Sequence, residues 1–231
     1  MRIFSLTDVG KKRKENQDNY WIARLDNNGS EVGVMCLCDG MGGLSNGEQA
    51  SHIIVEAVRE FFKTNTDIKG LSSVISAKNK EIYDLGNSSS NPSPMGTTCT
   101  VAIIKEGKCR ILHVGDSRLY KWSKLGGTKL LTTDHSALKK YNITAENNPE
   151  LYKKYKNMLT RCIGISPEVS VDFYTESCKK GDRFLVCSDG FWHFFNDYEL
   201  GTPRIEDLRG LVDECMDNGE TDNITVAVLE V

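Results

Sequence analysis

The chain has 231 residues, of which 39% are hydrophobic and 26% are charged, so it can form a sizeable core and is not a disordered polymer. Its net charge of −3 argues against a protein that binds a nucleic-acid backbone, because such proteins carry a basic surplus. The longest apolar run, near Val32–Cys38, is far shorter than the ~20 residues of a membrane helix, and the first residues lack the apolar stretch of a signal peptide.

The first half of the chain predicts three strands and then two helices. Apolar runs and alternating patterns predict strands at Arg2–Leu6, Tyr20–Leu25 and Val32–Cys38. Ser45 and Glu48 have the spacing of a capping box, and the apolar residues from Ala50 to Phe62 fall on one helical face. A second helix is expected over roughly Leu71–Leu85, followed by a polar loop at Asn87–Pro94.

The second half is richer in strands. We expect two hairpins, then two strands, a helix that Thr202 caps with Pro203 at its first position, and a closing strand. These strands are Thr98–Ile104, Cys109–Val114, Leu119–Trp122, Lys129–Thr132, Val169–Tyr174, Arg183–Cys187 and Ile224–Val231. The polar, lysine-rich stretch Ala137–Met158 is expected to be a surface excursion with helical parts. Hairpins segregated from helices indicate an α+β fold rather than a parallel doubly wound sheet.

The eight cysteines are expected to be free thiols in a reducing compartment, which predicts a cytoplasmic protein. No pair has the Cys-x-x-Cys spacing, and most lie in apolar runs, where cysteine packs as a small hydrophobe. The four histidines include no His-x-x-x-His pair, so there is little from which to build a zinc site with nitrogen or sulfur ligands.

Four aspartates lie where an apolar strand meets a turn: Asp39, Asp116, Asp189 and Asp222. For any single one of them, turn chemistry is the simpler explanation, because turns favour Asp strongly. Four in one chain favour a different explanation, since clustered carboxylates repel one another unless cations neutralise them. Oxygen ligands without His or Cys favour hard cations such as Mg²⁺ or Mn²⁺.

A phosphate group would suit such a centre. Two ions that share a carboxylate can activate a bridging water and neutralise phosphoryl oxygens. Arg13, in a polar turn, is the candidate phosphate ligand because a guanidinium binds two phosphate oxygens at once, although alone it would be an ordinary surface charge. Gly40, Gly42 and Gly43 leave the backbone after Asp39 open to a metal or a substrate.

Taken in order, these segments resemble the metal-dependent protein phosphatase family, type 2C, and in particular its bacterial branch. The resemblance covers essentially the whole chain. The matching segments are Thr7-Asp8-Val9-Gly10-x-x-Arg13-x-x-Asn16-Gln17-Asp18, Asp39-Gly40-Met41-Gly42-Gly43, Gly47-Glu48-x-Ala50-Ser51, Gly96-Thr97-Thr98, Val114-Gly115-Asp116-Ser117-Arg118-x-Tyr120, Leu131-Thr132-x-Asp134-His135-Ser136, Leu159-Thr160-Arg161-x-Ile163-Gly164, Gly181-Asp182, Cys187-Ser188-Asp189-Gly190 and Asp222-Asn223-Ile224-Thr225.

The resemblance implies a single catalytic domain over residues 1–231. Its fold would be a β-sandwich of two antiparallel sheets with helices on both sides, a four-layer α-β-β-α arrangement. The segment at about 137–158 would be the family's variable flap beside the active site. The implied activity is hydrolysis of phosphoserine and phosphothreonine monoesters by direct attack of a water that bridges two Mg²⁺ or Mn²⁺ ions.

The resemblance also implies the metal ligands. Asp39 would bridge the two catalytic ions, Gly40 would offer its backbone carbonyl to one of them, and Asp189 and Asp222 would complete the other. Asp18 would hold metal-bound water in the outer shell.

Two further roles follow from the resemblance. Arg13 would bind the substrate phosphate, and Asp116 would form a weaker third metal site with Asp189. The chain departs from the family at Gln17, where many members have Glu, and at Met41, which cannot donate a proton. His113 is expected to be structural, and His135 is not expected to be catalytic.

The expected partners are phosphorylated proteins, the substrates of serine/threonine kinases, with no nucleic acid and no membrane, and the expected state is a monomer. Two other functions stay open. One is a two-metal nuclease or phosphodiesterase, against which the acidic balance argues. The other is a catalytically weak pseudophosphatase or regulatory phosphoprotein-binding module, which would normally have lost a metal ligand.

Overall fold

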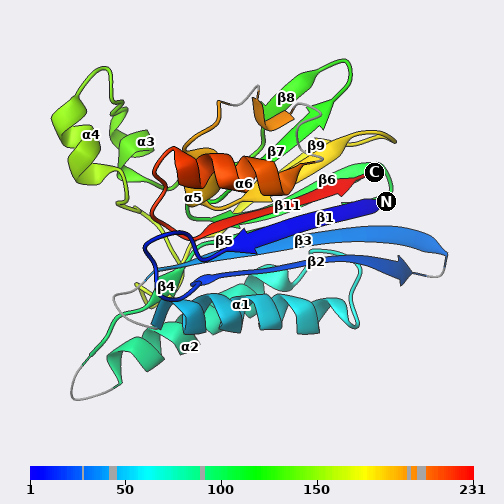
Figure 1. Ribbon diagram of the computed structural model, residues 1–231. Coiled ribbons are helices and arrows are strands. Elements are labelled where there is room, and N and C mark those ends of the chain that lie inside the picture. The colour runs from blue at the N-terminus through cyan, green and yellow to red at the C-terminus, as the bar shows by residue number, and fades with distance from the viewer. Residues whose placement is uncertain (28, 42–45, 89–91, 197–198, 202–206) are drawn as a thin grey trace.

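The computed structural model describes residues 1–27, 29–41, 46–88, 92–196, 199–201 and 207–231. Two antiparallel sheets pack face to face, and helices cover the outer face of each sheet (Figure 1). The predicted α+β sandwich with four layers is confirmed. Among the described residues, no helix combines the length and the apolar character that crossing a membrane requires.

The first sheet has five strands in the order β1-β11-β10-β7-β8. They are β1 (Arg2–Asp8), β11 (Ile224–Glu230), β10 (Arg183–Cys187), β7 (Arg118–Ser123) and β8 (Gly127–Leu130). The predicted hairpin of β7 and β8 is confirmed by their antiparallel register, in which Tyr120 lies opposite Leu130. The two ends of the chain meet here, because β1 pairs with β11 along its whole length.

The second sheet has the order β2-β3-β5-β6-β9, and a short β4 pairs with the end of β3. Its strands are β2 (Asp18–Asn27), β3 (Ser30–Met41), β4 (Gly96–Thr97), β5 (Cys99–Lys105), β6 (Lys108–Val114) and β9 (Asp172–Ser177). The predicted hairpin of β5 and β6 is also confirmed. The strand predicted from Val169 begins instead at Asp172.

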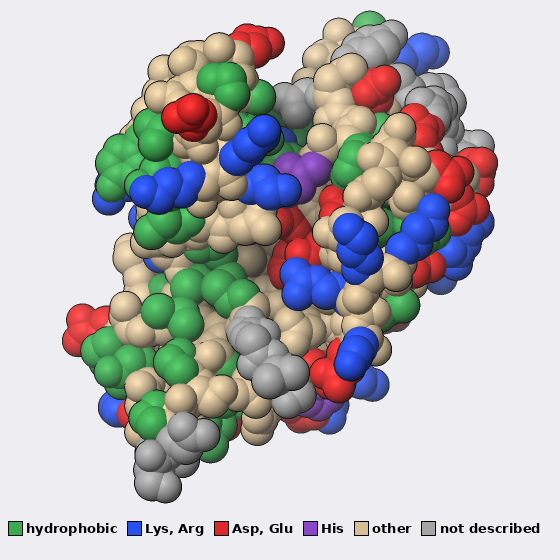
Figure 2. All heavy atoms as spheres, turned by 60° about the vertical axis from the view of Figure 1, so that its left-hand side comes forward, with side chains coloured by type: hydrophobic (Ala, Val, Ile, Leu, Met, Phe, Trp, Pro, Cys, Tyr) green, Lys and Arg blue, Asp and Glu red, His purple; other side chains and the backbone are tan. Residues whose placement is uncertain are grey.

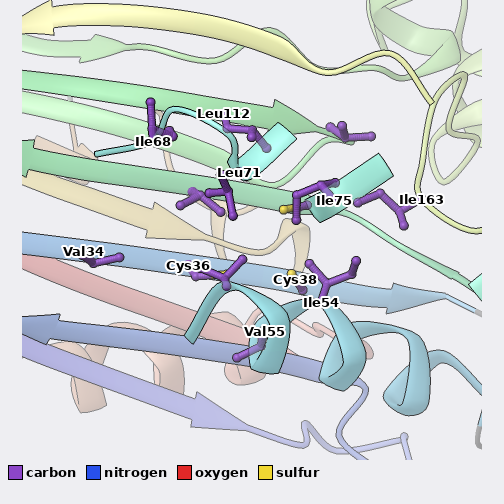
Figure 3. Packing of buried hydrophobic residues seen from close by; sticks show 14 of the residues in the cluster. Val34, Cys36, Cys38, Ile54, Val55, Ile68, Leu71, Ile75, Leu112 and Ile163 are labelled. Carbon is purple, nitrogen blue, oxygen red and sulfur yellow. The ribbon is translucent and has the colours of Figure 1, made fainter. Parts of the chain in front are cut away.

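The continuous apolar run of β3 has a simple cause, because both of its faces are covered. Val34, Cys36 and Cys38 point toward the helices α1 (Asn46–Phe62) and α2 (Leu71–Asn87), where they pack in one layer with residues such as Ile54 and Ile75 (Figure 3). The alternate residues Met35 and Leu37 point the other way, into the core between the two sheets. A strand buried on both faces loses the alternation that marks a half-buried strand.

The opposite outer layer is formed by α5 (Asp189–Trp192) and α6 (Leu208–Asp217), which pack on the five-stranded sheet. The side chain of Asp207 caps α6 by accepting a hydrogen bond from the backbone N–H of Gly210. The predicted caps Ser45, Thr202 and Pro203 lie outside the described residues, as do Gly42 and Gly43. Neither α5 nor β4 was predicted, and a short 3₁₀ turn, Glu199–Gly201, was also missed.

The lysine-rich excursion forms two short helices, α3 (Ala137–Tyr141) and α4 (Pro149–Tyr155), which stand apart from the sheets (Figure 1). We call residues 137–158 the flap. Its two ends meet at the body, where the backbone N–H of Ala137 donates to the carbonyl of Met158 and Ser136 pairs with Leu159. No residue of α4 is buried. The predicted surface excursion is thus confirmed in the structure.

Candidate active site

Four of the predicted aspartates line one cavity of about 310 Å³. Asp39 lies near the end of β3, Asp116 follows β6, Asp189 follows β10 and Asp222 precedes β11. Arg13, Gly40, Gln17 and Met41 also line the cavity, and so do Thr98, Asn157 and Leu159. Every residue that the sequence marked as a candidate ligand therefore lies at this cavity, except Asp18, which is buried beside it.

The topology explains why residues so far apart in sequence converge. In an antiparallel pair the end of one strand lies beside the start of its neighbour. Asp18 begins β2 directly opposite Asp39 in β3, and the end of β10 near Asp189 lies beside the start of β11 near Asp222. The cavity therefore opens at one end of the sandwich, with carboxylates from both sheets. Figure 2 shows acidic side chains at the bottom of this hollow and basic side chains on its rim.

The carboxylates repel one another strongly. Burial, and then the negative charges of Asp18, Asp189 and Asp116, raise the pKa of Asp39 well above its usual range. The pKa of Asp116 is raised in the same way, by burial and then by Asp189. The protein alone does not neutralise this charge, so a cation would be bound favourably here.

Asp18 carries the sharpest sign of a missing partner. Both of its carboxylate oxygens are buried and have no hydrogen-bond partner. Burial raises its pKa to about 7, although the nearby hydroxyls of Thr225 and Ser188 act in the opposite direction. Because buried polar groups in folded proteins are nearly always paired, these two oxygens indicate a position that water or an ion completes.

Arg13 is the one lysine or arginine among the described residues that line this cavity. Its guanidinium donates to Asp222 Oδ2 at 2.6 Å, and this hydrogen bond raises the pKa of Arg13. The other oxygen of Asp222 accepts from the backbone N–H of Asn223 at 2.8 Å. About half of the Arg13 side chain is exposed, so it faces the cavity with N–H groups still available.

Gly40 is required by close packing. A Cβ at this position would lie 2.3 Å from the carbonyl oxygen of Gly47 and 2.5 Å from that of Gln17. The adjacent peptide is held by Thr97 and Thr98, because Asp39 donates from its N–H to Thr98 Oγ1 and accepts at its carbonyl from both threonines. The ligand-bearing end of β3 is therefore fixed against α1.

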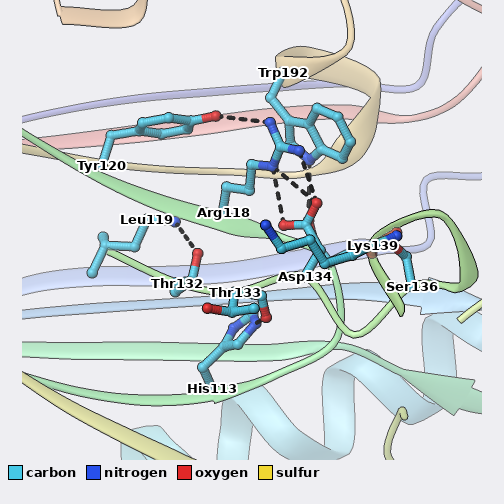
Figure 4. Close-up of polar contacts among 11 residues, drawn as sticks. His113, Arg118, Leu119, Tyr120, Thr132, Thr133, Asp134, Ser136, Lys139 and Trp192 are labelled. Carbon is cyan, nitrogen blue, oxygen red and sulfur yellow. Dashed lines mark hydrogen bonds and ion pairs between the residues drawn. The ribbon is translucent and has the colours of Figure 1, made fainter. Parts of the chain in front are cut away.

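Two networks that the sequence did not reveal hold the backbone at Asp116. The backbone N–H of Gly115 donates to His135 Nδ1 at 3.0 Å, and Trp192 Nε1 donates to the carbonyl of Asp116 at 3.1 Å. The Arg118 guanidinium carbon lies 3.4 Å from the Trp192 ring centroid, and the same guanidinium pairs with Asp134 (Figure 4). Trp192 lies three residues after Asp189, but nothing in the sequence marks it as a contact of Asp116.

The two histidines flagged from sequence lie in this supporting layer. His135 Nε2 bonds Asp172 Oδ2 at 3.1 Å, and its own backbone bonds Gly115 and Thr160. His113 is fully buried and bonds Thr100 and the carbonyl of Thr133. Neither lines the cavity of about 310 Å³, which agrees with the expectation that they are not catalytic.

The residues present suit a hard divalent cation. All the candidate donors are carboxylate or carbonyl oxygens, and the buried Asp18 oxygens lack a partner. No three His, Cys, Asp or Glu side chains within the described ranges form a ready cage around one point. One or two carboxylates per ion, completed by water, is the arrangement that Mg²⁺ usually takes in proteins.

Comparisons with known proteins agree with this geometry. A model of the protein phosphatase 2C family matches residues 10–228. Protein phosphatase PhpP of Streptococcus pneumoniae is 30% identical over 100% of this chain and 98% of its own length. Serine/threonine phosphatase Stp of Listeria innocua is 30% identical over 97% of this chain and 93% of its own.

The backbone agrees as well. Serine/threonine phosphatase Stp1 from Staphylococcus aureus superimposes with a TM-score of 0.84, covering 99% of this chain and 94% of that one at 28% identity. Sequence and fold thus match over nearly the whole length, and the chain belongs to the protein phosphatase 2C family as a bacterial-type serine/threonine phosphatase.

Proposed function

We propose that the cavity hydrolyses phosphoserine and phosphothreonine monoesters by direct attack of water, which two Mn²⁺ or Mg²⁺ ions, when bound, activate while they neutralise the phosphoryl oxygens. The observation that carries this proposal is the group of buried carboxylates from both sheets whose charge the protein leaves uncompensated. Members of this family are metal-dependent, which agrees with that excess of negative charge.

Each residue has a separate task in this proposal. Asp39 would be the carboxylate that both ions share, and the Gly40 carbonyl, Asp189 and Asp222 would supply their other protein ligands. Asp18 orients water from beneath, where both of its oxygens are free to accept. Its position directly opposite Asp39 in the β2–β3 register supports this role.

Arg13 would bind the phosphate, and Asp116 and Asp189 would hold a weaker third ion. The ion pair with Asp222 supports the role of Arg13, because it holds the guanidinium at the cavity while leaving donors for phosphate oxygens. Asp116 and Asp189 line the same cavity, and each raises the pKa of its neighbours by charge repulsion. No described observation favours a binding module without catalysis.

The deciding experiment measures turnover of para-nitrophenyl phosphate and of a phosphothreonine peptide, with Mn²⁺ or with chelator. We expect wild-type turnover to require Mn²⁺ and Asp39→Asn to abolish it. Turnover in chelator, or an Asp39→Asn variant as active as wild type, would refute the two-metal mechanism. A folded, Mn²⁺-bound wild type without turnover would instead favour the phosphoprotein-binding alternative.

The expected partners are proteins that serine/threonine kinases phosphorylate. The relatives named above are serine/threonine phosphatases, which supports this substrate class. All eight cysteines are free and seven of them are buried, which supports a reducing, cytoplasmic environment. The expected monomer is checked by light scattering on the eluting protein.

A further inference from the structure

The flap and the body enclose a second cavity, of about 510 Å³, next to the active site. Asp116 lines both this cavity and the catalytic one, so the two cavities adjoin at that residue. The floor includes Trp192 from the body and Leu138 and Ile143 from the flap, which gives it an apolar surface. A chain segment attached to a phosphorylated residue in the catalytic cavity can therefore extend into this space.

The flap side of this second cavity carries two lysines and one glutamate, and the body side adds Arg118, Asp134 and Asp116. Residues 137–158 contain five lysines and two glutamates, although the whole chain is acidic. Lys139 and Lys156 line the cavity, and within the described part of the chain their ammonium groups have no ion-pair partner. Tyr152 and Lys156 lie four residues apart, on one side of α4, and both also line a third cavity that reaches Asp222.

The flap also exposes apolar surface. Of the nine large hydrophobic side chains that are exposed among the described residues, three belong to this short segment: Tyr141, Leu151 and Met158. Apolar side chains beside unpaired cations are typical of a surface that contacts another protein rather than solvent alone.

Resting on the proposed function, we infer that this cavity receives the peptide segment beside the phosphorylated residue and that Lys139 and Lys156 select substrates with acidic side chains there. Charge complementarity is the argument: Arg118 is paired with Asp134, whereas the two flap lysines have no ion-pair partner among the described residues and outnumber Glu146 on the flap side. The apolar floor gives the peptide backbone a contact surface, and the lysines set its preferred sequence. Small phosphate esters do not reach this surface.

The test uses phosphothreonine peptides that are identical except for two flanking residues, which are both Glu or both Lys. The readout is the ratio of kcat/KM for the acidic and the basic peptide, with the rate on para-nitrophenyl phosphate reporting the catalytic cavity alone. We expect wild type to favour the acidic peptide by about tenfold, the combined effect of two exposed ion pairs. Lys139→Glu combined with Lys156→Glu should remove or invert that preference, and Arg at both positions should keep it.

A matched control comes from the flap itself, in α4. Lys153→Glu combined with Lys154→Glu makes the same change in net charge, yet neither residue lines this cavity. The control variant should retain the acidic preference. Equal loss in both double variants, or a preference untouched by the change at Lys139 and Lys156, would overturn the inference.

Binding separates this inference from the catalytic proposal. Anisotropy of the labelled peptides on Asp39→Asn measures peptide preference without turnover. A tenfold preference for the acidic peptide that disappears with Lys139→Glu and Lys156→Glu supports peptide binding in the second cavity, even if the enzyme proves inactive. Equal binding of acidic and basic peptides overturns the inference about the second cavity, even if hydrolysis is normal.

Discussion

At Asp18, folding buries a carboxylate whose oxygens lack a hydrogen bond of good geometry, and the nearby hydroxyls of Thr225 and Ser188 offset only part of the free-energy cost. Asp18→Asn removes the charge and keeps the shape. In chelator at pH 8 we expect the variant to have a free energy of unfolding at least about 1 kcal/mol higher than wild type. With Mn²⁺ present this advantage should shrink or reverse, because the variant loses a group that the ions use.

Urea unfolding in chelator and in Mn²⁺ measures both effects. Asp217→Asn is the control, because its side chain is largely exposed and, among the described residues, its one ion pair is with an exposed lysine. A wild type that is more stable than Asp18→Asn in chelator would contradict the account given for this carboxylate.

His113 makes a separate contribution to the pH dependence of stability. Burial, and then the neighbouring His135, lower its pKa from 6.5 to about 4. Between these two pKa values the unfolded chain therefore binds more protons than the folded one. The contribution of His113 to stability is fully present above pH 6.5 and is lost as the pH falls toward 4. The loss amounts to about 3 kcal/mol for this shift.

We expect His113→Asn to lose less stability than wild type between pH 6.5 and pH 4. The difference between the two proteins is the measured quantity, because the raised pKa values of the clustered aspartates act in the opposite direction in both. Urea midpoints measured between pH 6.5 and pH 4 give this difference, and the exposed His52→Asn is the control. Parallel curves for wild type and His113→Asn would show that His113 is not the group responsible.

Among the secondary-structure elements, the strands and the long helices were the most predictable. Arg183–Cys187 was predicted to the residue, and the burial of β3 on both faces explains why its apolar run was so clear. The short α5 and β4 were missed because neither is long enough to show a period. Trp192 and the His135 network were missed because their partners lie far away in sequence.

For the aspartates of the candidate site, too, the sequence does not reveal which residues are in contact. Their positions at strand ends were visible in the sequence, but that Asp18 lies opposite Asp39 depends on the register of β2 and β3. Their convergence came from the resemblance to a known family rather than from spacing. The pair between Arg13 and Asp222 was not foreseen, because 209 residues separate the two.

The base of the flap offers a prediction at the scale of elements. His135 joins the loop after β6, β9 and the end of the flap, through Gly115, Asp172 and Thr160. His135→Ala leaves the buried N–H of Gly115 without a partner, whereas Asp172 Oδ2 keeps the hydrogen bond from the Tyr174 hydroxyl. We expect a loss of about 1–3 kcal/mol in stability and a clear fall in kcat on para-nitrophenyl phosphate, because the Asp116 backbone loses its support.

This effect differs from that of the flap lysines. Changes at Lys139 and Lys156 should alter the preference between peptides, whereas His135→Ala should slow every substrate alike. His135→Gln, which can still accept from Gly115, should recover part of the rate. If His135→Ala is as stable and as fast as wild type, the network does not support the catalytic loop.

In the molecule as a whole, the cavity lies where the two sheets meet, so any ion bound there connects them. Asp18 and Asp39 belong to the six-stranded sheet, whereas Asp189 and Asp222 flank strands of the five-stranded one. Binding to the folded state alone adds about 2.7 kcal/mol when the metal is at a hundred times its Kd. For a domain of this size that corresponds to a rise of about 5–10 °C in Tm.

We therefore expect Mn²⁺ to raise the Tm of wild type in a single transition, because metal binding stabilises both sheets together. Asp39→Asn should show a much smaller rise, since Asp39 is the carboxylate on which the charges of four other aspartates act. Calorimetry in chelator and across a Mn²⁺ series measures both. An equal rise in the two proteins would place the stabilising ion elsewhere, and two separate transitions would show that the ions do not couple the sheets.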